Sequence, residues 1–143
     1  MLSHTLSVSN GSILNVAGSP ENTDADTGAV VTSDGTLLLF EVDHGSTVSL
    51  TGLTLYGGDG ALRVTGDSFV EVIDCTFKNN NITSSDLGGA IFVNGGNVVL
   101  KGETVFANNT ADYGGAIYMT ENSELNVTEG GSVYFVNNHA ADY

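Results

Sequence analysis

The fold of this chain is decided by a tetrapeptide that occurs three times, as Phe77-Lys-Asn-Asn80, Phe106-Ala-Asn-Asn109 and Phe135-Val-Asn-Asn138. Successive phenylalanines are 29 residues apart. A second tetrapeptide, Gly-Gly-Ala-Ile, alternates with the first at residues 88–91 and 114–117. Self-similarity with a period of about 20 to 50 residues is typical of arrays in which each unit buries its apolar face against its neighbours. The sequence therefore predicts a stack of one small unit.

Each unit has the pattern of three short strands. Residues 46–58 align with residues 68–80 at a shift of 22 positions, and apolar residues match apolar residues, for example Leu55 and Phe77. Runs of alternating polarity separated by Gly and Asn indicate strands rather than helices. In the third unit these runs cover residues 90–93, 97–101 and 104–108.

Three strands and 22 to 29 residues per unit predict an all-β fold, a parallel β-helix of about four to five coils. Each strand then pairs with its equivalent in the next coil, about 4.8 Å away. We expect one domain over residues 1–143, with an irregular first coil in 1–38 and regular coils in 39–143, as part of a longer array. In the first coil, Leu6 and Val8 match Leu125 and Val127 at an offset of 119 residues, whereas residues 29–38 fit no register.

Asparagines also recur at the end of each unit. Asn79, Asn108 and Asn137 share the 29-residue interval and are expected to stack at one bend. A buried ladder of asparagine side chains satisfies backbone groups that a bend leaves unpaired. We therefore expect this column to be structural.

Composition limits the classes of partner. The chain has 41% hydrophobic residues, and three basic residues against 17 acidic ones give a net charge of −14. This charge repels nucleic acid, anionic lipid and acidic polysaccharide. It serves either solubility, by keeping exposed sheet edges apart, or the binding of divalent cations. The acidic loops that fit weak Ca²⁺ binding are Asp24 with Asp26, and Asp43 with His44, but neither has the dense oxygen ligands of a calcium loop.

The sequence also limits the possible cellular locations of the chain. Its apolar runs are all shorter than the ~18 residues that a membrane helix needs. The start, Met1 to His4, does not open a signal peptide, so for an extracellular protein we expect the targeting segment to be missing from this chain.

The sequence gives little support for catalysis. Its histidines, His4, His44 and His139, lie in unrelated places and offer no zinc-binding spacing. The best cluster for carbohydrate chemistry is a set of charged residues expected on one face, which would offer a carboxylate pair for a glycosidase: Arg63, Glu71, Asp74, Lys101 and Glu103. Such residues are also ordinary solvent positions of a sheet. We predict that the chain is not an enzyme and holds no cofactor.

Two kinds of modification remain open. Cys75 is the only cysteine and falls on an inward position, which favours a core residue over an intermolecular disulfide. Asn-x-Ser/Thr sequons, the acceptors of N-glycosylation, occur at Asn10, Asn81, Asn108 and Asn126.

The alternation of Phe-x-x-Asn with Gly-Gly-Ala-Ile resembles the repeat of the chlamydial polymorphic outer membrane proteins, over roughly residues 61–143. The resemblance implies a right-handed parallel β-helix displayed on a cell surface, as in autotransporter passengers, with a role in adhesion. It assigns adhesion to the tetrapeptides, here Phe77, Asn80, Gly88, Gly89, Ala90, Ile91, Phe106, Asn109, Gly114, Gly115, Ala116, Ile117, Phe135 and Asn138. These residues also suit a scaffold, since Phe stacks and Gly permits bends closed to other residues.

Three functions stay open. The first is an extracellular, non-enzymatic adhesin or spacer whose loops, centred on residues 81–87 and 19–27, contact a cell-surface protein or glycan receptor. The second is a filament subunit that stacks end to end on copies of itself. The third is a carbohydrate-binding or carbohydrate-active β-helix protein.

Overall fold

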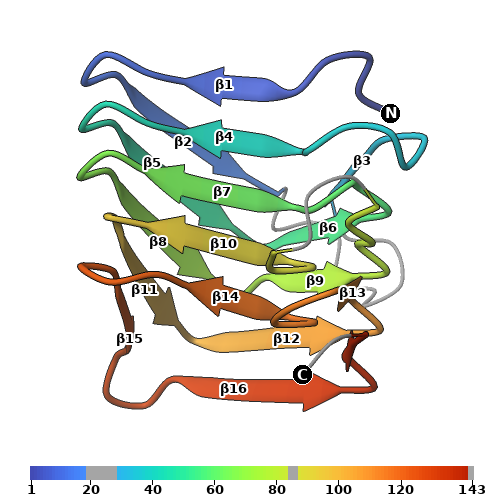
Figure 1. The fold of residues 1–143 in the computed structure, drawn as a ribbon. Helices are drawn as coiled ribbons and strands as arrows, with labels where there is room; N and C mark the ends of the chain where they lie inside the picture. The colour runs from blue at the N-terminus through green and yellow to red at the C-terminus, as the bar shows by residue number, and fades with distance from the viewer. Residues whose placement is uncertain (19–28, 84–86, 142–143) are drawn as a thin grey trace.

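The chain winds into a parallel β-helix (Figure 1). A computed structural model describes residues 1–18, 29–83 and 87–141. Three five-stranded parallel sheets form the sides of the coil, and every coil contributes one strand to each sheet. The described residues contain no helix. The predicted all-β solenoid is confirmed, with five coils.

The sheets follow from the order of strands along the chain. Sheet A contains β1 (Leu6–Val8), β4 (Phe40–Val42), β7 (Leu62–Thr65), β10 (Ile91–Asn94) and β14 (Ile117–Met119). Sheet B contains β2 (Ile13–Ala17), β5 (Thr47–Thr51), β8 (Phe69–Ile73), β11 (Asn97–Lys101) and β15 (Glu124–Val127). Sheet C contains β3 (Ala29–Thr32), β6 (Leu53–Tyr56), β9 (Thr76–Lys78), β12 (Glu103–Ala107) and β16 (Ser132–Val136). A fourth, two-stranded sheet pairs β13 (Thr110–Ala111) with β17 (His139–Ala140).

Equivalent residues of successive coils lie directly over one another. In sheet C, Phe106 is paired with Phe77 on one side and Phe135 on the other, in parallel register. The repeat interval of the sequence is therefore the length of one turn of the coil. Side chains alternate between the core and solvent, as in β8, where Val70 and Val72 are buried and Glu71 is half-buried.

The corners are formed by residues with left-handed backbone conformation. Between sheets A and B the turn of the second coil contains His44 (φ 52°) and Gly45 (φ 69°). Asn79, Asn108 and Asn137 leave sheet C with φ of 55°, 54° and 52°. Asparagine tolerates this region better than most residues because its side chain bonds locally.

The first coil corrects one sequence assignment. Leu6 pairs with Phe40 in sheet A, whereas Leu125 lies in sheet B, so the match at an offset of 119 residues superimposed strands of different sheets. Short alternating strands look alike in all three sheets, and the pattern alone does not separate them. In the segment 29–38, Ala29–Thr32 is β3 and pairs with β6. The residue after this segment, Leu39, is buried in the core outside any strand.

Candidate functional site

The repeated phenylalanines form a column of stacked rings inside sheet C. The ring centroids of Phe77 and Phe106 are 5.0 Å apart at 12°, and those of Phe106 and Phe135 are 5.1 Å apart at 10°. Offset stacking of this kind adds to the hydrophobic gain of burial. Phe77 and Phe106 are fully buried, whereas Phe135, in the last coil, is 59% exposed.

The asparagine that ends each Phe-x-x-Asn motif forms the buried ladder. Asn109 Oδ1 accepts hydrogen bonds from Asn80 N (3.1 Å) and Asn80 Nδ2 (3.0 Å), and Asn109 Nδ2 donates to Phe77 O (3.0 Å). Asn138 repeats this arrangement beneath Asn109, accepting from its N at 3.0 Å and its Nδ2 at 2.8 Å.

The sequence therefore predicted a ladder of the right kind at the wrong member of each Asn-Asn pair. Asn79, Asn108 and Asn137 make the left-handed bend instead, and Asn108 and Asn137 are exposed. Both columns have the same 29-residue interval, so the repeat does not distinguish them.

The glycine tetrapeptides pack against the segment that follows the asparagine ladder. A Cβ at Gly89 would collide with Gly115 O and with the backbone of Thr110, and one at Gly115 would collide with the backbone of His139. Gly88 and Gly114 have positive φ, 72° and 62°. Only glycine fits these close approaches, which explains why the two tetrapeptides alternate in the sequence.

The motif residues are thus mostly interior. In the third and fourth coils the structure buries most of the residues that the resemblance assigned to adhesion, including Phe77, Asn80, Ala90, Ile91, Phe106 and Asn109. Gly88, Gly89, Gly115 and Ala116 are buried as well, while Gly114, Ile117 and Asn138 are half-buried. Stacking accounts for these positions without a ligand, and their role in adhesion stays a prediction.

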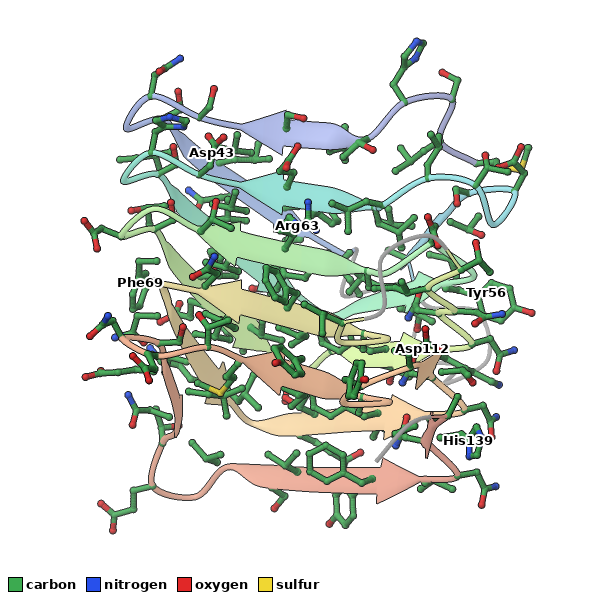
Figure 2. The ribbon with its side chains drawn as sticks, viewed as in Figure 1. Asp43, Tyr56, Arg63, Phe69, Asp112 and His139 are labelled. Atoms are coloured by element: carbon green, nitrogen blue, oxygen red, sulfur yellow. The ribbon has the colours of Figure 1, made fainter. Side chains whose placement is uncertain are left out.

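The structure separates the candidate carbohydrate-processing residues. Lys101 Nζ forms an ion pair with Glu71, and Asp74 Oδ1 accepts a hydrogen bond from Glu103 N at 2.9 Å. Arg63 points outward from a different sheet, A (Figure 2). The Glu71–Lys101 pair therefore lies on sheet B, Asp74 binds the backbone of Glu103 where sheet B meets sheet C, and Arg63 joins neither.

Sheet A carries an outward stack that the sequence analysis missed. The guanidinium carbon of Arg63 lies 5.2 Å from the ring centroid of Phe92, and the Phe92 and Tyr118 rings are 6.1 Å apart at 14°. Both faces of Phe92 are thus occupied within the protein. The register of sheet A puts these three residues in one column, and that column is the sequence signal for the stack.

Of the two acidic loops, the structure describes the one with Asp43 and His44. Asp43 Oδ1 lies 3.0 Å from His44 Nδ1, whereas Asp24 and Asp26 lie outside the described residues. Residues 1–18, 29–83 and 87–141 contain no group of three or more His, Cys, Asp or Glu side chains arranged to hold a metal ion. Ca²⁺ binding remains untested.

The cysteine and the sequon asparagines differ in solvent exposure. Cys75 is 1% exposed, which confirms its inward position, and burial raises the pKa of its thiol. In contrast, the sequon asparagines Asn10, Asn81, Asn108 and Asn126 are all exposed. The surface position leaves each amide accessible, while glycosylation itself stays a prediction.

The fold and its stacked corner define a class, the β-solenoid built from alternating Phe-x-x-Asn and Gly-Gly-Ala units. Residues 103–120 match the sequence profile of the Chlamydia polymorphic membrane protein repeat. This segment contains one complete pair of tetrapeptides, from Phe106 to Ile117, and the resemblance is confirmed there. The repeat is that of a surface-protein family.

The remaining comparisons add no relatives. Neither the curated proteins nor the solved structures include a significant match. The part of the chain that the structure describes has no helix of the length and apolar character needed to cross a membrane.

Proposed function

We propose that this chain is a non-enzymatic, extracellular surface protein that acts as an adhesin or spacer and binds its partner through variable loops. The partner would be a cell-surface protein or a glycan. The observation that carries the proposal is the contrast between a buried repeat motif and connections whose lengths vary from coil to coil. Binding residues are commonly found on loops that a rigid scaffold holds in place.

One variable corner lies between sheets C and A. The connection from β6 to β7 covers residues 57–61, that from β12 to β14 covers 108–116, and that from β9 to β10 covers 79–90. The connections from sheet A to sheet B vary less, between 9–12 in the first coil and 95–96 in the fourth. Those from sheet B to sheet C vary more, between residues 18–28 in the first coil and Gly52 alone in the second. The corner between sheets C and A therefore accepts insertions while the strands keep their register. The second loop expected from the sequence, residues 19–27, lies outside the described residues.

The test is a loop exchange. In one variant, residues 82–87 are replaced by a Gly-Ser sequence of equal length. The control variant carries Glu129→Gln, an exposed position on another corner. Beads coated with each protein are then scored for attachment to cultured cells, with circular dichroism to verify the fold. We expect the loop exchange to lower attachment at least ~10-fold, which corresponds to about 1.4 kcal/mol. Unchanged attachment by the exchanged protein would contradict the proposal.

A second function, end-to-end assembly with copies of itself, is favoured by the surface of the last coil. Phe135 is 59% exposed, Val127 47% and Val136 46%, while the matched Phe106 and Leu100 of the preceding coil are buried. Unpaired strand edges and apolar side chains together form a template for a further strand. The charge of −14 opposes such contacts, so raising the salt concentration should promote them. Filaments in negative-stain images at high salt would support assembly, and a monomeric mass by light scattering at every salt concentration would contradict it.

A further inference from the structure

The turns that join sheet A to sheet B contain a hollow of ≈ 380 Å³ between the third and fifth coils. Its lining comes from three successive coils and includes Asp67, Phe69, Gly96, Asn97, Asn122 and Glu124. All of these residues lie in the described part of the chain. The hollow is on a different corner of the coil from the variable loops.

A glycine lines the hollow in the fourth coil. The position before each sheet B strand is serine in the second, third and fifth coils, as Ser46, Ser68 and Ser123, but glycine in the fourth, as Gly96. A Cβ at Gly96 would lie 2.8 Å from Val64 Cγ1 and 3.2 Å from Ser68 O. At Gly96 the turn of the fourth coil therefore packs closer to Val64 and Ser68 than a residue with a Cβ would allow.

One wall of the hollow is aromatic. Phe69 is the first residue of β8, is 37% exposed and points away from the coil (Figure 2). It occupies an outward position in a column with Asn97 and Glu124. An outward phenylalanine gains little from folding, and its ring leaves apolar and π surface available to a ligand.

The other groups are hydrogen-bond acceptors. Asn97 Nδ2 donates to Glu124 Oε2 at 3.2 Å, which orients that carboxylate. Asn97 Oδ1 is buried and has no hydrogen-bond partner. Within the described chain, neither Asp67 nor Glu124 forms an ion pair, and the hollow has no basic residue in its lining. Two carboxylates without a cationic partner, beside an exposed aromatic ring, favour a donor that carries positive charge.

We propose that this hollow binds the side chain of a lysine or arginine presented by a basic segment of a partner protein. The cation would lie against the ring of Phe69, within reach of the carboxylates of Asp67 and Glu124. The charge of −14 attracts a basic partner over a long range and repels an acidic one. This binding site goes beyond the proposed function, since it uses a different corner and different residues.

The test uses the full chain and two peptides, a lysine decapeptide and the equivalent glutamine decapeptide. Amide chemical shifts are followed by NMR during titration, and affinities are measured by calorimetry. The variants are Phe69→Ala, Asp67→Asn and Glu124→Gln, with Glu129→Gln as a control of equal charge change on another exposed turn. Asp67 and Glu124 are exposed, so their substitution should leave the thermal transition unchanged, whereas Phe69→Ala removes a 37% exposed ring and should lower it by only a few degrees.

We expect saturable shifts centred on Gly95 and Gly96 with the lysine peptide only. Glu124→Gln or Asp67→Asn should weaken binding about 3- to 10-fold, and Phe69→Ala about 3-fold. Glu129→Gln should weaken it less than about 2-fold. Equal losses in all charge variants, or shifts spread over the whole surface, would show that attraction is general and overturn the proposal.

A sugar titration distinguishes another ligand class. If N-acetylglucosamine shifts Gly95 and Gly96 and the lysine peptide does not, the hollow binds a carbohydrate and the proposal is wrong. These results are independent of the loop exchange, because cell attachment through residues 81–87 can fail while the hollow still binds a basic peptide, and the reverse also holds.

Discussion

The fourth and fifth coils contain the same tetrapeptide in the same register, but the phenylalanines of the two coils differ in exposure and in the number of neighbouring rings. Phe106 and Phe135 stack 5.1 Å apart, but Phe106 has a ring on both sides and is 0% exposed, whereas Phe135 has a ring on one side and is 59% exposed. The residue and its backbone are equivalent in both coils. In this solenoid, what a residue contributes to stability depends on the coils above and below it.

The largest expected effect comes from removing the interior ring. Phe106→Ala should lower the free energy of unfolding by about 3–5 kcal/mol, because it leaves a cavity between Phe77 and Phe135. Phe135→Ala should cost less than about 1.5 kcal/mol, because water already reaches that ring. Urea denaturation followed by circular dichroism measures both.

The chain supplies a matched control at this position. Leu55 occupies the Phe column in the second coil and is fully buried. Phe106→Leu should therefore cost less than Phe106→Ala, near 1.5 kcal/mol or below for an apolar replacement of similar size. Equal losses in Phe106→Ala and Phe135→Ala would refute the dependence on neighbouring coils.

The asparagine ladder should show the same contrast with a smaller effect. Asn109→Ala removes the acceptor of Asn80 N and Asn80 Nδ2 in a buried site, which should cost about 2–3 kcal/mol. Asn138→Ala should cost about 1 kcal/mol, since water replaces its bonds at a half-buried position. Faster hydrogen exchange at the Asn80 amide in Asn109→Ala is the diagnostic signal. Unaltered exchange there would mean that the ladder is not what protects the corner.

Alanine substitutions at Gly89 and Gly45, which lie on different corners, distinguish the cost of close packing from the cost of backbone strain. Gly89→Ala forces a Cβ into the backbone of Thr110 and Gly115 and should cost about 1–3 kcal/mol. Gly45→Ala meets no atom within 4 Å and retains only the strain of φ 69°, about 1 kcal/mol. Thermal melts of the two variants test the order. If Gly45→Ala were the more damaging, strain rather than packing would dominate.

The smallest effect concerns Cys75 in the interior third coil. Burial raises the pKa of its thiol, so the folded state holds the proton more tightly than the unfolded chain does. The stability that the protonated thiol contributes is fully present below the pKa of the thiol in the unfolded chain, about 8.5. It is lost as the pH rises through the pKa of the thiol in the folded protein. We expect the urea midpoint to fall more steeply above pH ~9 in the native chain than in Cys75→Ala.

A thiol reagent provides the second measurement for this residue. Cys75 should react with Ellman's reagent only after urea is added, since the thiol is 1% exposed and protonated. Rapid reaction in the folded protein at neutral pH would contradict its interior position.

The periodicity of the sequence predicted much of the fold, but it did not predict parts of the surface. Phe77, Phe106 and Phe135 predicted a parallel column because identical residues at equal intervals stack when each turn has equal length. The interval did not reveal which asparagine of each pair faces inward. The stack of Arg63 on Phe92 depends on how outward side chains of paired strands turn toward each other, and the hollow beside Gly96 depends on turns of unequal length.

By itself, the sequence determined that this chain is an all-β solenoid with a phenylalanine column, since alternating polarity and a fixed repeat leave few other ways to bury the apolar residues. Only the tertiary structure decided that Asn80, Asn109 and Asn138 form the ladder while Asn79, Asn108 and Asn137 bend the chain. The physical reason is that the two asparagines of a pair recur with the same period, so the repeat does not distinguish them. The backbone dihedral angles at the corner direct one side chain into the core and the other away from it.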